Sequence, residues 1–447
     1  QLTNELELDA QRAKAYFLLG DHQIDIDEDE VILNEPQESI DETPADAYTI
    51  CLRCLTIAPG STCSCTCGDK AVIQQLRRID LKQPTEPCSC ISCGARSSTA
   101  IIFRFLTGQD APVSVLATAL YQQLPPQLSS KSSELPGEGR KLLVFSDSRQ
   151  DAAFFAPYLE RTYNQVLQRR LIFKTLLEDP DGRSGELRLQ DCMLPLVKQA
   201  EAAGIFQRRQ SRNERQRIVM TWLMQEFVAI NRRISLEGLG LLHFRLVQPD
   251  RWRTPTMLRN APWSLNDEES WYLLCLLLDT LRRQGSVTFP ENVDPQQDDF
   301  MPRNKAIFVR EEGSDAKAGV LSWVPTRGNN LRFNLLDRLL SRLHPTMPAE
   351  DRRVHVIDAL RGIWRDLTDR YSQWRGYFVS SNIQRQGVVY QLSHKFWELV
   401  PSETGQGYRC NRCHSVSFYN VRGLCPTNGC DGILEPLERD TPDLMAN

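Results

Sequence analysis

Four cysteines near the C-terminal end of the sequence have the residue type and the spacing of a metal site. Cys410 and Cys413 form a C-x2-C pair, and after a loop of 11 residues Cys425 and Cys430 form a C-x4-C pair. A C-x2-C turn directs two thiolates to one point, and a second pair on a facing hairpin completes the tetrahedral coordination of Zn²⁺. The pattern predicts a structural zinc ribbon, with His414 facing away. Four buried free thiols are the alternative.

A second group of cysteines lies nearer the start of the sequence and is larger. Its members are Cys51, Cys54, Cys63, Cys65, Cys67, Cys88, Cys90 and Cys93. "CLRC" and "CISC" are its C-x2-C pairs, so we predict one zinc ion held by both pairs. The predicted ligands are Cys51, Cys54, Cys90 and Cys93. The four cysteines between the pairs leave a second metal ion or an iron–sulfur cluster open.

The stretch "KLLVFSDSRQDAAFFAPYLE" (141–160) places polar residues at the end of an apolar strand. We expect a strand at 141–145 and a helix from residue 150 onward. Ligands of open α/β sheets bind at the carboxyl ends of strands, and the N–H groups at a helix N-terminus hold phosphate. The stretch is similar to the strand that opens the second RecA-like domain of superfamily 2 nucleic-acid motors, and this similarity implies that Ser146, Ser148 and Arg149 contact a nucleic-acid backbone. The alternative is a helix cap formed by Asp147 or Ser148.

A basic segment, "FQRRQSRNERQR" (206–217), is a further candidate for phosphate contact. Spacings of three and four residues bring several of its arginines onto one helical face. We predict that Arg208, Arg209 and Arg212 contact nucleic acid. A solvated basic helix surface is the alternative.

Composition limits the remaining function classes. Hydrophobic residues make up 41% and charged residues 25% of the 447 residues, and the formal net charge is −4. Nucleic-acid binding would therefore depend on local basic surfaces. The sequence contains no apolar run of membrane-spanning length and no secretory signal, so we expect a cytoplasmic protein without a membrane partner. C-x2-C pairs in such a protein favour metal over disulfides.

Several segments occur in an order that matches a known family. They are "FRFLTG", "FSDSRQDAAFFA", "RRISLEGLGLLHFRL", "LLDTLRRQGSV" and the closing "YRCNRC…LCPTNGCDGILEPL". Together they resemble a group of large bacterial superfamily 2 DEAD/DEAH-type helicases. This group includes the phage-defence helicases of the Druantia and DISARM systems and the mitomycin-repair helicases. The resemblance covers roughly residues 50–447 and implies an ATP-dependent DNA helicase or translocase, with anti-phage defence as the preferred role.

The resemblance also implies that this chain is an internal fragment of a longer motor. No G-x4-G-K-[ST] phosphate-binding loop follows a strand in the sequence, so ATP and Mg²⁺ would be bound by the full-length protein outside this segment. No catalytic residue and no ATPase activity are expected of the segment alone. Expected partners are single-stranded or duplex DNA and other proteins of a defence system. The alternative is a zinc-ribbon adapter that binds nucleic acid or protein without a motor.

The expected fold class is mixed α/β with a large, mostly α-helical insertion. The resemblance adds the start of a RecA-like second helicase domain, and the cysteines add two zinc-binding modules. The expected order is a helix end and acidic linker (1–48), the first Cys-rich module (49–95), a connector (96–139), the first strand and helix of the RecA-like domain (140–170), the helical insertion (171–345), a helical, winged-helix-like part (346–404), the zinc ribbon (405–436) and a return linker (437–447).

Overall fold

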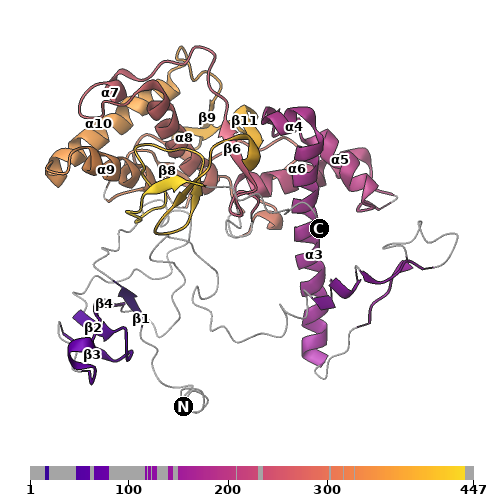
Figure 1. The fold of residues 1–447 in the computed structure, drawn as a ribbon. Coiled ribbons are helices and arrows are strands. Elements are labelled where there is room, and N and C mark those ends of the chain that lie inside the picture. Colours follow the sequence, from indigo (N-terminus) through magenta and orange to yellow (C-terminus); the bar gives the residue numbers. More distant parts are fainter. Residues whose placement is uncertain are drawn as a thin grey trace.

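The computed structural model describes most of the chain after residue 149 and shorter stretches before it (Figure 1). The described residues are 16–19, 47–60, 65–79, 116–117, 119–121, 123–127, 139–143, 149–207, 209–229, 235–301, 304–315, 317–326 and 328–437. They form an N-terminal antiparallel sheet, a long helix, and an α/β body that carries the ribbon. In the described part of the chain, no helix has both the length and the apolar character that a membrane crossing needs.

The first Cys-rich module is an antiparallel sheet in the order β1-β4-β2-β3. Its strands are β1 (Tyr16–Leu19), β2 (Ala47–Cys51), β3 (Ile57–Pro59) and β4 (Ile73–Ile79). β1 corrects the helix end expected there, because Tyr16 pairs with Ile79 and Leu19 with Leu76. The aromatic and apolar side chains of β1 suit a pleated surface once a partner strand is present. That partner lies far along the chain, so local spacing did not reveal it.

Helix α3 (Arg149–Glu178) confirms the helix expected from residue 150 onward. The strand expected at 141–145 is not found in its described part, because residues 141–143 form no strand and Leu143 is 80% exposed. An apolar strand of this kind is stable only when neighbours cover it, and no described strand pairs with these residues. Residues 144–148 lie outside the described residues. The described residues therefore contain no RecA-like sheet.

The body alternates helices with short strands. Its helices are α4 (Pro180–Ser184), α5 (Met193–Ala202), α6 (Arg212–Phe227), α7 (Thr256–Arg259), α8 (Asp267–Gln284), α9 (Leu331–Leu343) and α10 (Ala349–Thr368). Its strands are β5 (Leu187–Arg188), β6 (Leu242–Leu246), β7 (Phe308–Arg310), β8 (Val320–Ser322), β9 (Phe378–Ile383), β10 (Gly387–Leu392) and β11 (Trp397–Pro401). The ribbon adds β12 (Tyr408–Cys410), β13 (Val416–Ser417) and β14 (Leu434–Pro436).

These strands form three small sheets, in the orders β5-β11-β6, β8-β7-β10-β9 and β13-β12-β14. All of their pairings are antiparallel except β7 with β8. Strands β9, β10 and β11 follow one another in sequence but are divided between two of these sheets. β10 pairs with β9, which precedes it, and β11 leaves the hairpin to pair with β5 and β6.

One apolar core runs from Leu171 on α3 to Leu424 in the ribbon. The parts expected at 171–345, 346–404 and 405–436 therefore share a core and are not separate units. Long-range pairing is the reason, since β11 of the second part is the central strand between β5 and β6 of the first. Trp364, Trp374 and Trp397 lie in this core and are at most 5% exposed.

Helices α8 and α9 form the part of the body that holds the ribbon. α8 begins with a capping box, in which the Asn266 side chain accepts from Glu269 N while the Glu269 carboxylate accepts from Asn266 N. Gly285, with φ 85°, ends the helix in the left-handed conformation that glycine adopts without strain. α9 is capped by Asn330, the residue before its first turn, whose side chain accepts from Phe333 N. Both helix starts are therefore fixed by local sequence, and the ribbon packs against elements with defined ends.

Candidate metal centres

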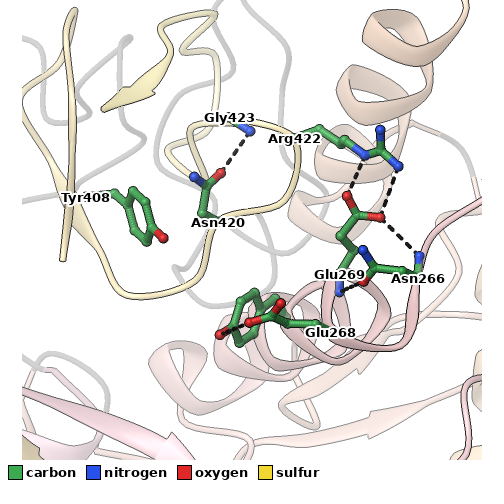
Figure 2. A pocket seen from close by; sticks show the side chains of 8 residues that line it. Asn266, Glu268, Glu269, Tyr408, Asn420, Arg422 and Gly423 are labelled. Carbon is green, nitrogen blue, oxygen red and sulfur yellow. Dashed lines mark hydrogen bonds and ion pairs between the residues drawn. The ribbon is translucent and has the colours of Figure 1, made fainter. Parts of the chain in front are cut away.

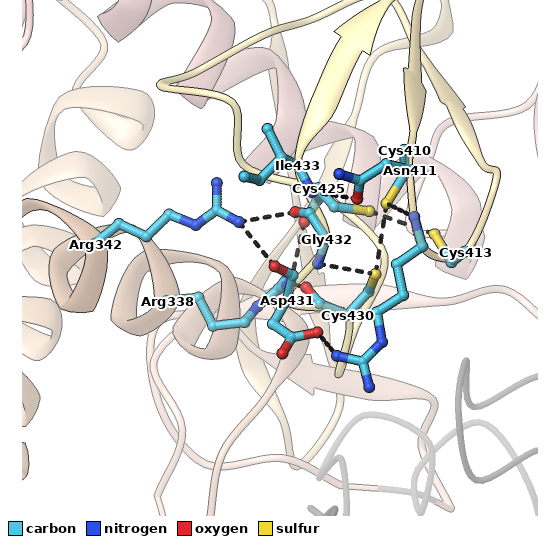
Figure 3. A network of polar contacts seen from close by, with 11 residues as sticks. Arg338, Arg342, Cys410, Asn411, Cys413, Cys425, Cys430, Asp431, Gly432 and Ile433 are labelled. Carbon is cyan, nitrogen blue, oxygen red and sulfur yellow. Dashed lines mark hydrogen bonds and ion pairs between the residues drawn. The ribbon is translucent and has the colours of Figure 1, made fainter.

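In chain order, we call Cys51, Cys54, Cys65 and Cys67 the first cluster and Cys410, Cys413, Cys425 and Cys430 the second cluster. The four sulfur atoms of the second cluster meet at one end of the ribbon (Figure 3). The Sγ atoms of Cys410, Cys413, Cys425 and Cys430 all lie within 4.8 Å of one another. Cys410 Sγ lies 3.7 Å from Cys430 Sγ, and Cys413 Sγ lies 3.5 Å from Cys425 Sγ. Four thiolates that each lie about 2.3 Å from one zinc ion are about 3.8 Å apart, so the spacing fits a tetrahedral site. The structure thus brings together the four ligands that the sequence predicts.

A tight turn explains why the first two of these sulfur atoms point to one spot. Cys410 N donates to Ser415 O at 2.9 Å, and His414 N donates to Cys410 O at 3.1 Å. His414 completes the turn with φ 58°. Its exposed side chain is not in the cluster, in agreement with the sequence interpretation.

Backbone N–H groups also point at the sulfur atoms. Arg412 N donates to Cys410 Sγ and Gly432 N donates to Cys430 Sγ, each at 3.4 Å. A Cβ atom at position 432 would collide with Cys410 Sγ, so the close approach of this backbone requires glycine. Hydrogen bonds to sulfur favour the ionised form, which is the form that binds metal.

The electrostatics of the cluster call for a cation. Burial opposes ionisation of Cys413, but hydrogen bonds from Ser415 outweigh it and hold the pKa of Cys413 at about 6. Burial raises the pKa of Cys430 to about 12. Neighbouring thiolates repel one another, so all four ionise together only around a positive ion. A buried donor set made only of thiolates suits Zn²⁺ and leaves no coordination position for water.

Helix α9 supports the second half of the site with a row of polar side chains (Figure 3). Arg338 donates to Cys425 O at 3.1 Å and also to Cys430 O. One turn further on, Arg342 donates to Asp431 O at 3.0 Å and to Gly432 O at 2.8 Å. Residues four apart lie on one helical face, so the two guanidinium groups satisfy consecutive carbonyl groups of the ligand loop.

Helix α8 contacts the ribbon from a second direction. Arg422 forms a two-pronged ion pair with Glu269, with nitrogen–oxygen distances of 2.6 and 3.1 Å (Figure 2). The same carboxylate belongs to the capping box of α8, so one side chain both starts the helix and holds the ribbon. An open polar cleft lies at this junction. Its lining residues are Asn266, Glu268, Glu269, Tyr272, Tyr408, Asn420, Arg422 and Gly423.

The first cluster has the same local turn. Cys51 N donates to Thr56 O at 3.0 Å, Leu55 N donates to Cys51 O at 2.7 Å, and Leu55 has φ 61°. The backbone N–H of Cys54 holds the pKa of Cys51 at about 6, whereas a hydrogen bond with Cys54 raises the pKa of Cys67 to about 12. The four thiols of the first cluster therefore also need a nearby cation before all of them can ionise.

The second half of the first site differs from the prediction. Cys65 and Cys67 complete the group with Cys51 and Cys54, and all four Sγ atoms lie within 4.8 Å of one another. Four thiolates are enough to fill a tetrahedral site. The predicted ligands Cys90 and Cys93 lie outside the described residues. Closing the shorter loop to residue 65 costs less chain entropy than closing the loop to residue 90. The C-x-C spacing of Cys65 and Cys67 is the sequence signal for this half of the site.

The predicted nucleic-acid contacts are only partly within the described residues. Ser146, Ser148 and Arg208 lie outside them, and of Arg149 the structure describes only its position at the start of α3. Arg209 and Arg212 are exposed, but they do not share a helix, because the Ser211–Glu214 capping box starts α6 at Arg212. The S-x-x-E signal for this boundary was present in the sequence. Arg215 is engaged with Glu201 at 2.8 Å.

Comparisons with protein-family models, with characterised proteins and with solved structures found no match to this chain. The candidate site is therefore defined by its own geometry. That geometry comprises two tetracysteine clusters built on the same turn, both suited to structural zinc.

Proposed function

We propose that this chain is a zinc-stabilised, nucleic-acid-binding segment of an ATP-dependent DNA helicase or translocase in bacterial anti-phage defence. The observation that carries the proposal is the closed tetracysteine ribbon mounted on α8 and α9. A metal ion held by four thiolates stabilises the fold and leaves no coordination position for a reactive water. We therefore assign the segment a structural and nucleic-acid-binding role rather than a catalytic one. The motor assignment depends on the ordered motifs of the sequence, among which "FSDSRQDAA" leads directly into α3.

In this proposal ATP and Mg²⁺ are bound by a part of the motor outside these residues. The sequence has no phosphate-binding loop of the G-x4-G-K-[ST] type, so the chain itself supplies no nucleotide site of that kind. Its contribution is to hold DNA near the motor and to keep the α8–α9 region folded.

Two measurements test the proposal. Elemental analysis of the chain purified without added metal should give about two zinc ions per chain, one for each cluster. Polypeptide that contains this chain together with the phosphate-binding loop should show DNA-stimulated ATP hydrolysis, whereas the chain alone should show none. Less than half an equivalent of zinc contradicts the metal assignment. Robust ATP turnover by the chain alone contradicts the assignment of ATP binding to a part of the motor outside these residues.

A second candidate function is a zinc-ribbon adapter without motor activity. The observation that favours it is the exposure of Leu143 in a stretch where a motor domain would have a buried strand. The two candidates differ in one result. DNA-stimulated ATPase activity of the longer polypeptide supports the motor, and its absence in a polypeptide that binds both zinc and DNA supports the adapter.

A further inference from the structure

Two loops of the body present arginines and one tyrosine to solvent. The first loop precedes α7 and contains Arg251 and Arg253. The second connects α10 to β9 and contains Arg370, Tyr371 and Arg375. All five side chains are exposed, and Tyr371, at 85%, is the most exposed large apolar or aromatic side chain in the described part of the chain. We call these five residues the arginine–tyrosine surface.

The two loops are joined edge to edge. The side chain of Gln373 accepts a hydrogen bond from Arg253 N at 2.7 Å and donates one to Arg253 O at 2.9 Å. Beneath this contact Trp252 packs edge-on against both Trp271 and Trp374, with ring centroids 5.0 and 6.0 Å away. In Figure 1 the elements that follow the loops, α7 and β9, both lie on the upper side of the body. The hydrogen bonds between Arg253 and Gln373 place the two loops side by side.

The loop that carries Tyr371 has a defined shape. Tyr371 N donates to the side chain of Asp369 at 2.9 Å, and Trp374 N donates to Ser372 Oγ at 3.1 Å. The indole of Trp374 is 1% exposed and donates to Asp366 at 3.1 Å. A buried tryptophan thus anchors the loop, while the tyrosine three residues earlier stands in solvent. An exposed ring on a fixed loop is available for stacking at little cost in conformational entropy.

The charge of this surface is positive, although the chain as a whole is acidic. Four arginines lie within the two loops, and none of them forms an ion pair with another residue in the described ranges. The exposed carboxylates of Asp250 and Asp369 offset part of this charge. The guanidinium of Arg370 lies 5.4 Å from the centre of the Tyr371 ring. Arginine, unlike lysine, offers a planar fork that matches phosphate.

We propose that the arginine–tyrosine surface binds single-stranded nucleic acid, with Tyr371 stacked on a base and the arginines on flanking phosphates. Stacking on aromatic side chains within a basic groove is how proteins hold single strands without reading their sequence. Duplex DNA does not fit this chemistry as well, because its bases are already stacked. The proposal rests on the proposed nucleic-acid function and assigns it a surface distinct from the residues that the sequence singled out.

The test is fluorescence anisotropy with a labelled oligothymidine of about 20 nucleotides and the whole 447-residue chain. Tyr371→Ala should weaken binding about 5- to 150-fold, the range of one lost base stack, and Tyr371→Phe should retain wild-type affinity within about threefold. Arg251→Gln combined with Arg253→Gln should lower the slope of log affinity against log salt by about 1.4, since each phosphate contact to a single strand contributes about 0.7.

The matched control removes two charges elsewhere. Lys174 on α3 and Lys198 on α5 are both exposed, and replacing both with glutamine should leave the salt slope unchanged. If the wild-type chain binds no nucleic acid, both this inference and the proposed function fail. If it binds but Tyr371→Ala and the double arginine variant behave like wild type, only this inference fails. The inference also fails if the chain binds a matched duplex more tightly than the oligothymidine. It fails likewise if polyglutamate competes for binding as strongly as unlabelled oligothymidine does.

Discussion

The two tetracysteine clusters share one local turn but differ in what surrounds it. "CLRCLT" (51–56) and "CNRCHS" (410–415) both place the residue after the second cysteine at positive φ, and both place a hydroxyl beside that cysteine. Thr56 Oγ1 lies 3.2 Å from Cys54 Sγ, and Ser415 Oγ lies 3.1 Å from Cys413 Sγ. The same short sequence pattern therefore produces the same half-site in two unrelated surroundings.

The surroundings decide how the rest of the molecule depends on the metal. Around the first cluster most of the large apolar side chains are exposed, including Leu52 at 49% and Leu55 at 66%, and Leu76 is the buried exception among those described. The second cluster has three buried cysteines, and its ligand loop is bonded to α9. Val421 and Leu424 of the same ribbon belong to the core of the body. A metal ion in the first cluster would therefore supply most of the core of its module, whereas a metal ion in the second would be one part of a larger core.

The largest difference should appear when one ligand is removed from each cluster. Cys425→Ser should release one zinc ion and lower the free energy of unfolding of the body by more than about 4 kcal/mol, because the ligand shell is continuous with the core. Cys54→Ser should also release one zinc ion but leave the stability of the body unchanged. All 8 tryptophans lie at or after residue 222, so tryptophan fluorescence during urea unfolding reports on the body alone. Equal destabilisation by both variants would refute this distinction.

The support from α9 can be removed without touching a ligand. Burial lowers the pKa of Arg338, yet the charged side chain is held by the carbonyl groups of Cys425 and Cys430. Arg338→Met should leave those carbonyls unsatisfied and lower stability by about 2–3 kcal/mol. It should also accelerate zinc transfer from the second cluster to a chromogenic chelator. Arg342→Gln, at a more exposed position, is the control and should lower stability and accelerate zinc transfer by less than half as much. If both substitutions have equal effects, the support depends on the positive charge alone.

Acid should weaken the body, and with it the support of the second module. Burial lowers the pKa of His394 from 6.5 to about 4. The unfolded chain then binds the proton more tightly, so this stabilisation is complete above pH 6.5 and is lost as the pH falls towards 4. The wild-type body should be about 2 kcal/mol less stable at pH 5 than at pH 7 through this group. In urea unfolding of His394→Gln, the loss of stability between pH 7 and pH 5 should be about 2 kcal/mol smaller than in the wild type. If the variant loses as much stability as the wild type, His394 is not the source of the pH dependence.

The smallest effect should be the same in both modules. Leu55 and His414 occupy the left-handed region, which costs a side chain roughly 1 kcal/mol, and glycine avoids that cost while losing more entropy on folding. Leu55→Gly and His414→Gly should therefore each slow zinc release from their own cluster slightly, corresponding to at most about 1 kcal/mol. Chelator-transfer kinetics measure both. Opposite signs in the two modules would show that the two turns are not equivalent.

Much of the secondary structure was accessible from local patterns. Helix α3 was predicted because apolar residues follow the strand-like segment at helical spacing, and the ribbon cysteines were predicted because a C-x2-C turn is a local structure. The start of α6 was missed although Ser211 and Glu214 signal it. Strand β1 was missed for a different reason, since four apolar residues do not distinguish a helix end from a strand.

The sequence by itself determined the two half-sites, because backbone turns and cysteine spacing act over only a few residues. Only the tertiary structure decided which partners complete them. Cys65 and Cys67 meet Cys51 and Cys54 because β4, which follows them in the chain, pairs with β2, which ends at Cys51. The support of Cys425 by Arg338 spans 87 residues of sequence. Likewise, Arg253 and Gln373 meet across 120 residues. Contacts at such separations leave no periodic signal, since they arise when packed elements bring distant backbone groups within hydrogen-bonding distance.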